Sequence, residues 1–83
     1  MIISEQIRAA RGLISWNQTQ LAEASGLSVQ TIKRMENQGT GKSSAENVQR
    51  IQQALENAGV IFIADASPSN NGGSGVRLIG KGE

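Results

Sequence analysis

The most restrictive feature of this sequence is a series of helix start and stop signals that divides residues 4–59 into short segments. Within each segment, hydrophobic residues recur three and four positions apart, which is the spacing of an amphipathic helix. Each segment also begins near a serine or asparagine that can cap a helix N-terminus. The predicted helices run from Ser4 to about Leu13, from Asn17 to Gly26, from Ser28 to about Asn37 and from Ser43 to Gly59. We therefore expect a mainly α fold.

Two of these helix starts show the fuller pattern of a capping box. Gln20 lies three residues after Asn17, and Glu46 lies three residues after Ser43. Glu46 is also one helical turn before Arg50, so we expect a weak ion pair between them. Trp16 is the only tryptophan, and its place before the second helix predicts packing against the core.

The residues after Gly59 follow a different pattern. Two short runs rich in β-branched residues, Val60 to Ile63 and Val76 to Ile79, predict β-strands. Between them, residues 65–75 are rich in glycine, serine and asparagine and are expected to be mobile. The sequence thus predicts a helical domain over residues 1–59 and a strand tail over residues 60–83. Whether the strands form a hairpin or pair with another molecule stays open.

Composition argues against an enzyme or a metal protein. The 83 residues include no cysteine and no histidine, and Asp65 is the only aspartate. Those residue types supply most general bases, thiol nucleophiles and transition-metal ligands, so we expect no catalytic residue, metal site or cofactor. No apolar run approaches the ~18 residues of a membrane span. Glu5, Arg8 and Arg11 interrupt the region where a signal peptide would be apolar, so a cytoplasmic protein without a membrane partner is expected.

The third predicted helix has two chemically different sides. At about 100° per residue, Ile32 and Met35 fall on one side, and a polar, basic set falls on the other. Such a helix suits a position between a hydrophobic interior and an external partner. Two short helices joined by a turn with a glycine, the second displaying polar side chains, can place that second helix in the major groove of DNA. There Gln30 can bind adenine, and Lys33 or Arg34 can bind guanine.

These residues resemble a known family. The run Asn17-Gln18-Thr19-Gln20-Leu21-Ala22-Glu23-Ala24-Ser25-Gly26-Leu27-Ser28, followed by Gln30-Thr31-Ile32-Lys33-Arg34-Met35-Glu36-Asn37, is similar to the helix-turn-helix of the XRE family, the Cro and phage-repressor type. The resemblance covers roughly residues 4–59. It implies a lambda-repressor-like bundle of about five short helices, double-stranded operator DNA as the ligand and a homodimer as the active form.

The resemblance also implies roles for individual residues. The positions that read bases in the family correspond to Ser28, Val29, Gln30, Lys33 and Arg34, with Val29 against a thymine methyl group. The positions that contact phosphate correspond to Gln18, Thr31, Asn37, Thr40 and Lys42, with Gln18 also bracing Gln30. Arg11 and Glu36 occupy positions where the family often has an interhelical ion pair.

The chain departs from the family pattern in two places. Residues 38–42 contain two glycines and few basic residues, and the strand from Val60 to Ile63 replaces the final family helix. If they pair with another molecule, the strands are our candidate for joining two subunits through an intermolecular sheet, with half-sites about 34 Å apart. The residues assigned to that interface are Val60, Ile61, Phe62, Ile63, Val76 and Leu78.

The favoured function is a bacterial, sequence-specific DNA-binding transcriptional regulator of the repressor kind. Charge supports this choice modestly, because residues 28–50 carry four basic and two acidic residues within a chain of net charge +1. Two alternatives stay open. The first is an antitoxin that binds a toxin partner and represses its own operon. The second is a protein-interaction module that works through Val60 to Ile79 without binding DNA.

Overall fold

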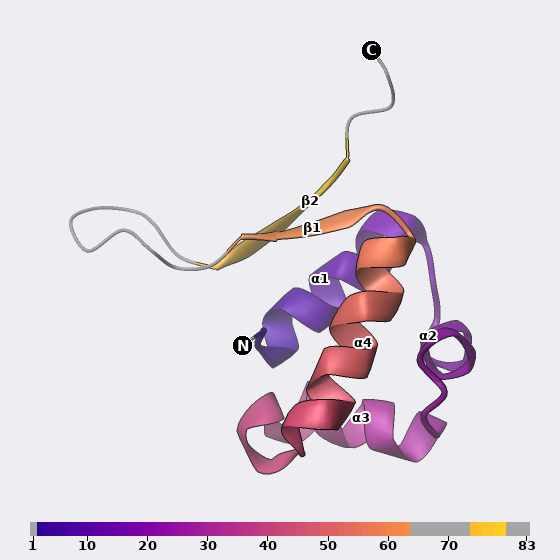
Figure 1. Ribbon diagram of the computed structural model, residues 1–83, viewed down its shortest axis with the longest axis vertical. Helices are drawn as coiled ribbons and strands as arrows, with labels where there is room; N and C mark the ends of the chain where they lie inside the picture. The colour runs from indigo at the N-terminus through magenta and orange to yellow at the C-terminus, as the bar shows by residue number, and fades with distance from the viewer. Residues whose placement is uncertain (1, 64–73, 80–83) are drawn as a thin grey trace, which may run out of the picture.

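A computed structural model describes residues 2–63 and 74–79 of the chain (Figure 1). The described residues form four α-helices, one 3-10 turn and two β-strands. Their bounds are α1 Ser4–Ile14, α2 Gln18–Ser25, α3 Val29–Gln38, η1 Thr40–Lys42, α4 Ala45–Asn57, β1 Val60–Ile63 and β2 Gly75–Leu78. The mainly α fold with two C-terminal strands is confirmed, and β1 follows α4 directly. Residues 65–73 of the predicted mobile loop lie outside the described residues.

The predicted starts of α2 and α3 are confirmed in atomic detail. The Asn17 Oδ1 atom accepts a hydrogen bond from the Gln20 backbone N–H at 2.8 Å, and the Asn17 backbone N–H donates to Gln20 Oε1 at 2.8 Å. Ser28 caps α3, because its Oγ atom accepts a hydrogen bond from the Thr31 N–H at 3.1 Å. Side chains therefore satisfy N–H groups that the first turn of each helix leaves unpaired.

The predicted starts of α1 and α4 are wrong by one residue. Ser4 is the first residue of α1 and not its cap, because its hydroxyl donates to the Met35 carbonyl oxygen in α3. Ser44 replaces Ser43 as the cap of α4, with its Oγ atom accepting from the Asn47 N–H at 3.1 Å. A serine pair leaves the register of a cap ambiguous, and a partner distant in sequence can redirect a hydroxyl.

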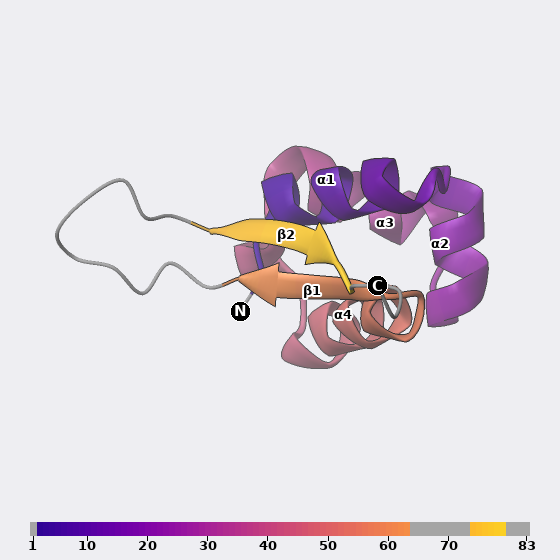
Figure 2. The same cartoon turned by 90° about the horizontal axis from the view of Figure 1, so that it is seen from above.

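The core lies where the helices meet under the two strands. Its largest fully buried side chains are Ile7, Leu21, Ile32, Met35, Ile51, Leu55 and Val60. Trp16 is half-buried and packs against this core, as predicted. Seen from above in Figure 2, β2 lies over α1 and β1 lies over α4. Figure 1 shows α3 at the opposite end of the molecule from the strands, so the two features have separate surfaces.

The strands pair with each other as an antiparallel hairpin, with Val60 opposite Leu78 and Phe62 opposite Val76. This pairing corrects the expected intermolecular sheet, because β1 and β2 pair with each other within one chain. Val60 is only 1% exposed, and Phe62 and Val76 pack against the core. Because side chains alternate between the two faces of a strand, these residues face the helices and hold the hairpin on its own subunit. Val60 is therefore buried within its own subunit, and Phe62 and Val76 are half-buried there.

Gln6, which the sequence did not single out, connects α1 to the hairpin. It is buried, and its Nε2 atom donates to the carbonyl oxygens of Ile63 at 3.1 Å and Gly75 at 3.0 Å. Its Oε1 atom accepts from the Ile3 N–H at 2.9 Å. One amide group therefore joins the start of α1 to both strands.

We expect Gln6→Leu to destabilise the hairpin by about 1–2 kcal/mol, since a leucine of similar size cannot replace these hydrogen bonds. Hydrogen exchange of the backbone amides would show faster exchange in β1 and β2 than in α4. A matched change at an exposed glutamine, Gln49→Leu, should leave the exchange of the strands unaltered. Equal effects of the two substitutions would contradict a specific role for Gln6.

Candidate nucleic-acid interface

The turn between α2 and α3 determines how these two helices are oriented relative to each other. Gly26 ends α2 with φ 75°, a left-handed conformation that suits glycine because it has no Cβ atom. The N–H groups of Gly26 and Leu27 both donate to the Ala22 carbonyl oxygen, at 2.9 and 3.1 Å. Ser28 then caps α3. The chain therefore changes direction within the three residues between α2 and α3, which is the compact connection that a helix-turn-helix needs.

The two predicted sides of α3 are confirmed by burial. Ile32 and Met35 are 0% exposed and face the core, whereas Gln30, Lys33, Arg34 and Asn37 are exposed. None of Gln30, Lys33 and Arg34 makes a hydrogen bond or ion pair with another described residue within the α2–α3 region. Their polar groups are thus available to an external partner, and the helix that carries them lies at one end of the molecule (Figure 1).

Two other predicted base-contacting residues already have internal contacts. The Ser28 hydroxyl caps α3 and lies 2.9 Å from Thr31 Oγ1. Val29 is half-buried and packs against the core, so only part of its side chain can reach a thymine methyl group. Gln30, Lys33 and Arg34, by contrast, are exposed and make no such contact with the described residues.

The predicted phosphate contacts divide in the same way. Asn37 and Lys42 are exposed beside the end of α3. The predicted phosphate contact of the Thr40 side chain needs correction. This side chain is 5% exposed, and its hydroxyl donates to the Ile2 carbonyl oxygen at 2.8 Å. Its hydroxyl holds the N-terminal segment against η1 and is unavailable to DNA. No local pattern indicates this contact, since the two residues are far apart along the chain.

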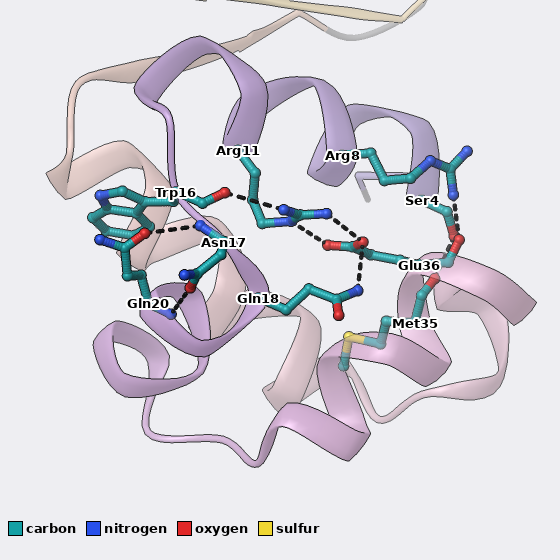
Figure 3. Close-up of polar contacts among 9 residues, drawn as sticks. All are labelled: Ser4, Arg8, Arg11, Trp16, Asn17, Gln18, Gln20, Met35 and Glu36. Carbon is teal, nitrogen blue, oxygen red and sulfur yellow. Dashed lines mark hydrogen bonds and ion pairs between the residues drawn. The ribbon is translucent and has the colours of Figure 1, made fainter.

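Gln18 does not make the expected contact with Gln30. Its Nε2 atom donates to Glu36 Oε1 at 3.1 Å, so this side chain braces Glu36 and not Gln30 (Figure 3). Gln18 is the first residue of α2. The contact therefore links the start of α2 to the second half of α3, and it can fix the angle between the two helices.

Glu36 is the centre of a polar cluster beneath α3, drawn in Figure 3. It is only 2% exposed, and the Arg11 guanidinium binds its carboxylate in a bidentate pair, with Nε to Oε2 at 2.7 Å and Nη2 to Oε1 at 2.8 Å. Arg11 also donates from Nη1 to the Trp16 carbonyl oxygen at 3.0 Å. Arg8 donates to the Glu36 carbonyl oxygen. The predicted Arg11–Glu36 ion pair is confirmed, and it joins α1 to α3.

The electrostatics of this cluster affect the exposed side of α3. The hydrogen bond from Arg11 to the Glu36 carboxylate raises the pKa of Arg11 above its ordinary value, against the opposing effect of desolvation. The only acidic residue of α3 is thus buried and paired with a cation. Lys33 and Arg34 supply the exposed charges of the helix, so its outer side is positive, which favours an anionic partner.

The described residues contain no group of histidine, cysteine, aspartate and glutamate side chains that could hold a metal ion. Among the helices that the structure describes, none is long and apolar enough to cross a membrane.

Comparisons with known proteins agree with this geometry. The sequence model of the helix-turn-helix family matches residues 7–57, which run from α1 to the end of α4. Two curated relatives, from Sinorhizobium medicae and Rhizobium meliloti, are each named as an uncharacterized HTH-type transcriptional regulator. Each is 33% identical over 73 residues, which cover 88% of this chain and 51% of the relative. The chain thus spans about half the length of the curated relatives it matches.

Proposed function

This chain belongs to the helix-turn-helix family, of the XRE type, and from that membership we propose that it is a sequence-specific DNA-binding transcriptional regulator. In this proposal α3 enters the major groove, where Gln30, Lys33 and Arg34 contact base edges. Ser28 and Val29 lie at the start of the same helix and contribute the remaining, smaller contacts. The proposed role is that of a binding protein. It would act in the cytoplasm, where bacterial DNA lies.

The observation that carries the proposal is the division of α3 into a buried side and an unpaired basic side. Helices on a protein surface often have a polar outer side, but an outer side is usually mixed in charge. Here Glu36 is turned inward and neutralised, which leaves cations and amides outside. Amide and guanidinium groups are the side chains that form paired hydrogen bonds with adenine and guanine.

Asn37 and Lys42 complete the proposed interface by contacting phosphate oxygens at the end of α3, with smaller contributions from Gln18 and Thr31.

We propose that two subunits bind together as a homodimer, because a single recognition helix covers only about one half-site. Selection of bound fragments from a random DNA pool would test the function. The expected result is a preferred sequence with two-fold symmetry. Failure to enrich any sequence at low salt would overturn the proposal.

Lys42→Ala should weaken binding to preferred and unrelated DNA alike, because a phosphate contact carries no base information. The slope of log affinity against log salt concentration should fall by about one for each bound half-site. Fluorescence anisotropy across a salt series would measure both effects. Arg50→Ala is the control, since Arg50 is exposed on α4 and paired with Glu46 at 3.1 Å. Loss of base preference in Lys42→Ala would contradict its assignment to phosphate.

A further inference from the structure

A polar hollow of about 400 Å³ lies between the start of α1 and the end of α3. Its lining includes Glu5 and Arg8 from α1, Asn37 from α3, and Gly39 and Gly41 from the segment that follows α3. We call this feature the polar hollow. Among the described residues that line it, Arg8 is the only basic one.

The end of α3 holds Arg8 in place at this hollow. The carbonyl groups in the last turn of a helix lack the N–H partner that a continuing helix would supply. The chain turns away after α3 at Gly39, whose φ is 95°, and Arg8 donates from Nη1 to the Glu36 carbonyl oxygen. The other terminal nitrogen of Arg8 points away from Glu36 (Figure 3). The guanidinium is therefore fixed at one nitrogen and keeps further donors for an outside acceptor.

The polar hollow borders the outer side of α3, which carries the proposed base contacts. Asn37 lies one helical turn after Lys33, so the two side chains lie on the same side of the helix. Both are exposed, and Asn37 lines the hollow together with Arg8. A DNA strand that contacts Lys33 through a base and Asn37 through a phosphate therefore brings its backbone to the hollow.

We propose that Arg8 is a further phosphate-contacting residue and that the polar hollow receives one phosphodiester group of the DNA backbone. This inference rests on the proposed function. The planar guanidinium can donate two parallel hydrogen bonds to phosphate oxygens. Residues 38–42 contain a single basic residue, Lys42. Arg8 thus supplies from α1 a second cation at the end of α3.

The space beside Gly41 leaves room for the phosphate. A Cβ atom added at Gly41 would meet no neighbouring atom within 4 Å, and this glycine is exposed. A larger side chain at this position would therefore project into open space at the hollow without straining the fold. It would occupy the volume that the DNA backbone needs.

Glu5 opposes the contact that we propose. It is exposed, lines the same hollow and lies three residues before Arg8 on α1, so the two side chains are neighbours on the helix. Its carboxylate repels a phosphate group. The Glu36 carboxylate has less effect, because it is buried and paired with Arg11. Removal of the Glu5 charge should therefore act in the opposite sense to removal of Arg8.

Fluorescence anisotropy of labelled duplex DNA across a salt series tests the proposal, with one duplex of the selected sequence and one of unrelated sequence. Arg8→Gln should weaken binding at low salt about tenfold for each bound half-site, as expected for a lost charge-assisted hydrogen bond. The slope of log affinity against log salt concentration should fall by about one for each half-site. Arg8→Lys should keep the slope. Arg50→Gln removes the same charge from an exposed position on α4 and should also keep it.

Two further variants test the hollow without removing Arg8. Glu5→Gln should tighten binding to both duplexes, because it removes a negative charge beside the phosphate. Gly41→Gln should weaken binding to both, because it fills the open space and changes no charge. Gly12→Gln is the matched control, since a Cβ atom at Gly12 in α1 would also meet nothing within 4 Å.

An unchanged salt slope in Arg8→Gln would overturn the proposal even if affinity fell. In that case Arg8 would serve only the last turn of α3, and the loss would appear in the free energy of unfolding, measured by denaturant. An equal fall of the slope in Arg50→Gln would overturn it too, because the effect would then follow from net charge alone.

Failure of the proposed function gives a different pattern. Equal binding of all DNA sequences, with a salt slope that depends on Arg8, would refute sequence-specific regulation and support the phosphate contact. Selection of a preferred sequence by a protein whose slope does not depend on Arg8 would refute only the phosphate contact.

Discussion

Arg11→Met is expected to lower the free energy of unfolding by about 3–5 kcal/mol, which is the usual result of removing one partner from a buried ion pair. The Glu36 carboxylate, which is 2% exposed in the wild type, would lose its bidentate cation, and among the described residues Gln18 would be its remaining donor. The bond from Arg11 to the Trp16 carbonyl oxygen would also be lost. Denaturant unfolding followed by the fluorescence of Trp16, the only tryptophan, would measure the change.

A second arginine provides the control for this prediction. Arg50 pairs with Glu46 at 3.1 Å, but both side chains are exposed, by 50% and 74%. Exposed pairs contribute little because solvent screens them, so Arg50→Met should change the stability by less than about 0.5 kcal/mol. Similar losses in the two variants would show that burial does not determine the strength of the Arg11–Glu36 pair.

The double variant Arg11→Met with Glu36→Gln separates the pair from its surroundings. A neutral amide in place of the carboxylate removes the uncompensated charge, so the double variant should be more stable than the sum of the two single losses predicts. Strict additivity would mean that Arg11 stabilises the domain only through its other contacts.

The elements of this fold were predictable where local chemistry decides the structure. The Asn17 capping box, the Ser28 cap and the two sides of α3 depend on residues within one or two helical turns of each other. The hairpin strands were also predictable from their β-branched residues. Their pairing partner was not, because a short apolar strand can pair within its own chain or with another chain.

The parts of the site that were missed depend on contacts between distant segments. The Thr40 hydroxyl binds the Ile2 carbonyl oxygen, and Gln18 binds Glu36 across two helices. Each of these side chains is an ordinary polar residue in sequence, and only the packing of the helices determines its partner. The Arg11–Glu36 pair was found in advance because the family resemblance supplied that long-range information.

The second large effect is expected at Arg34, whose side chain is exposed and lies on the outer side of α3. Arg34→Ala should cost about 1–3 kcal/mol of base discrimination, because a paired contact from arginine to guanine distinguishes one base pair from the other three. Preference should relax at one position of the half-site, and Gln30→Ala should relax it at another. Binding to DNA libraries randomised at single positions would measure both changes.

The comparison of Arg34 with Arg11 makes this prediction specific. Both residues are arginines, but Arg11 binds Glu36 inside the domain and Arg34 faces outward. Arg34→Ala should therefore alter base preference and leave the free energy of unfolding nearly unchanged. Arg11→Met should lower the free energy of unfolding, and the molecules that stay folded should keep their base preference. If Arg34→Ala weakened binding to all DNA sequences equally and left base preferences intact, Arg34 would have to be assigned to a phosphate contact and not to a base contact. In that case Gln30 and Lys33 would be the remaining exposed residues of α3 able to read the groove.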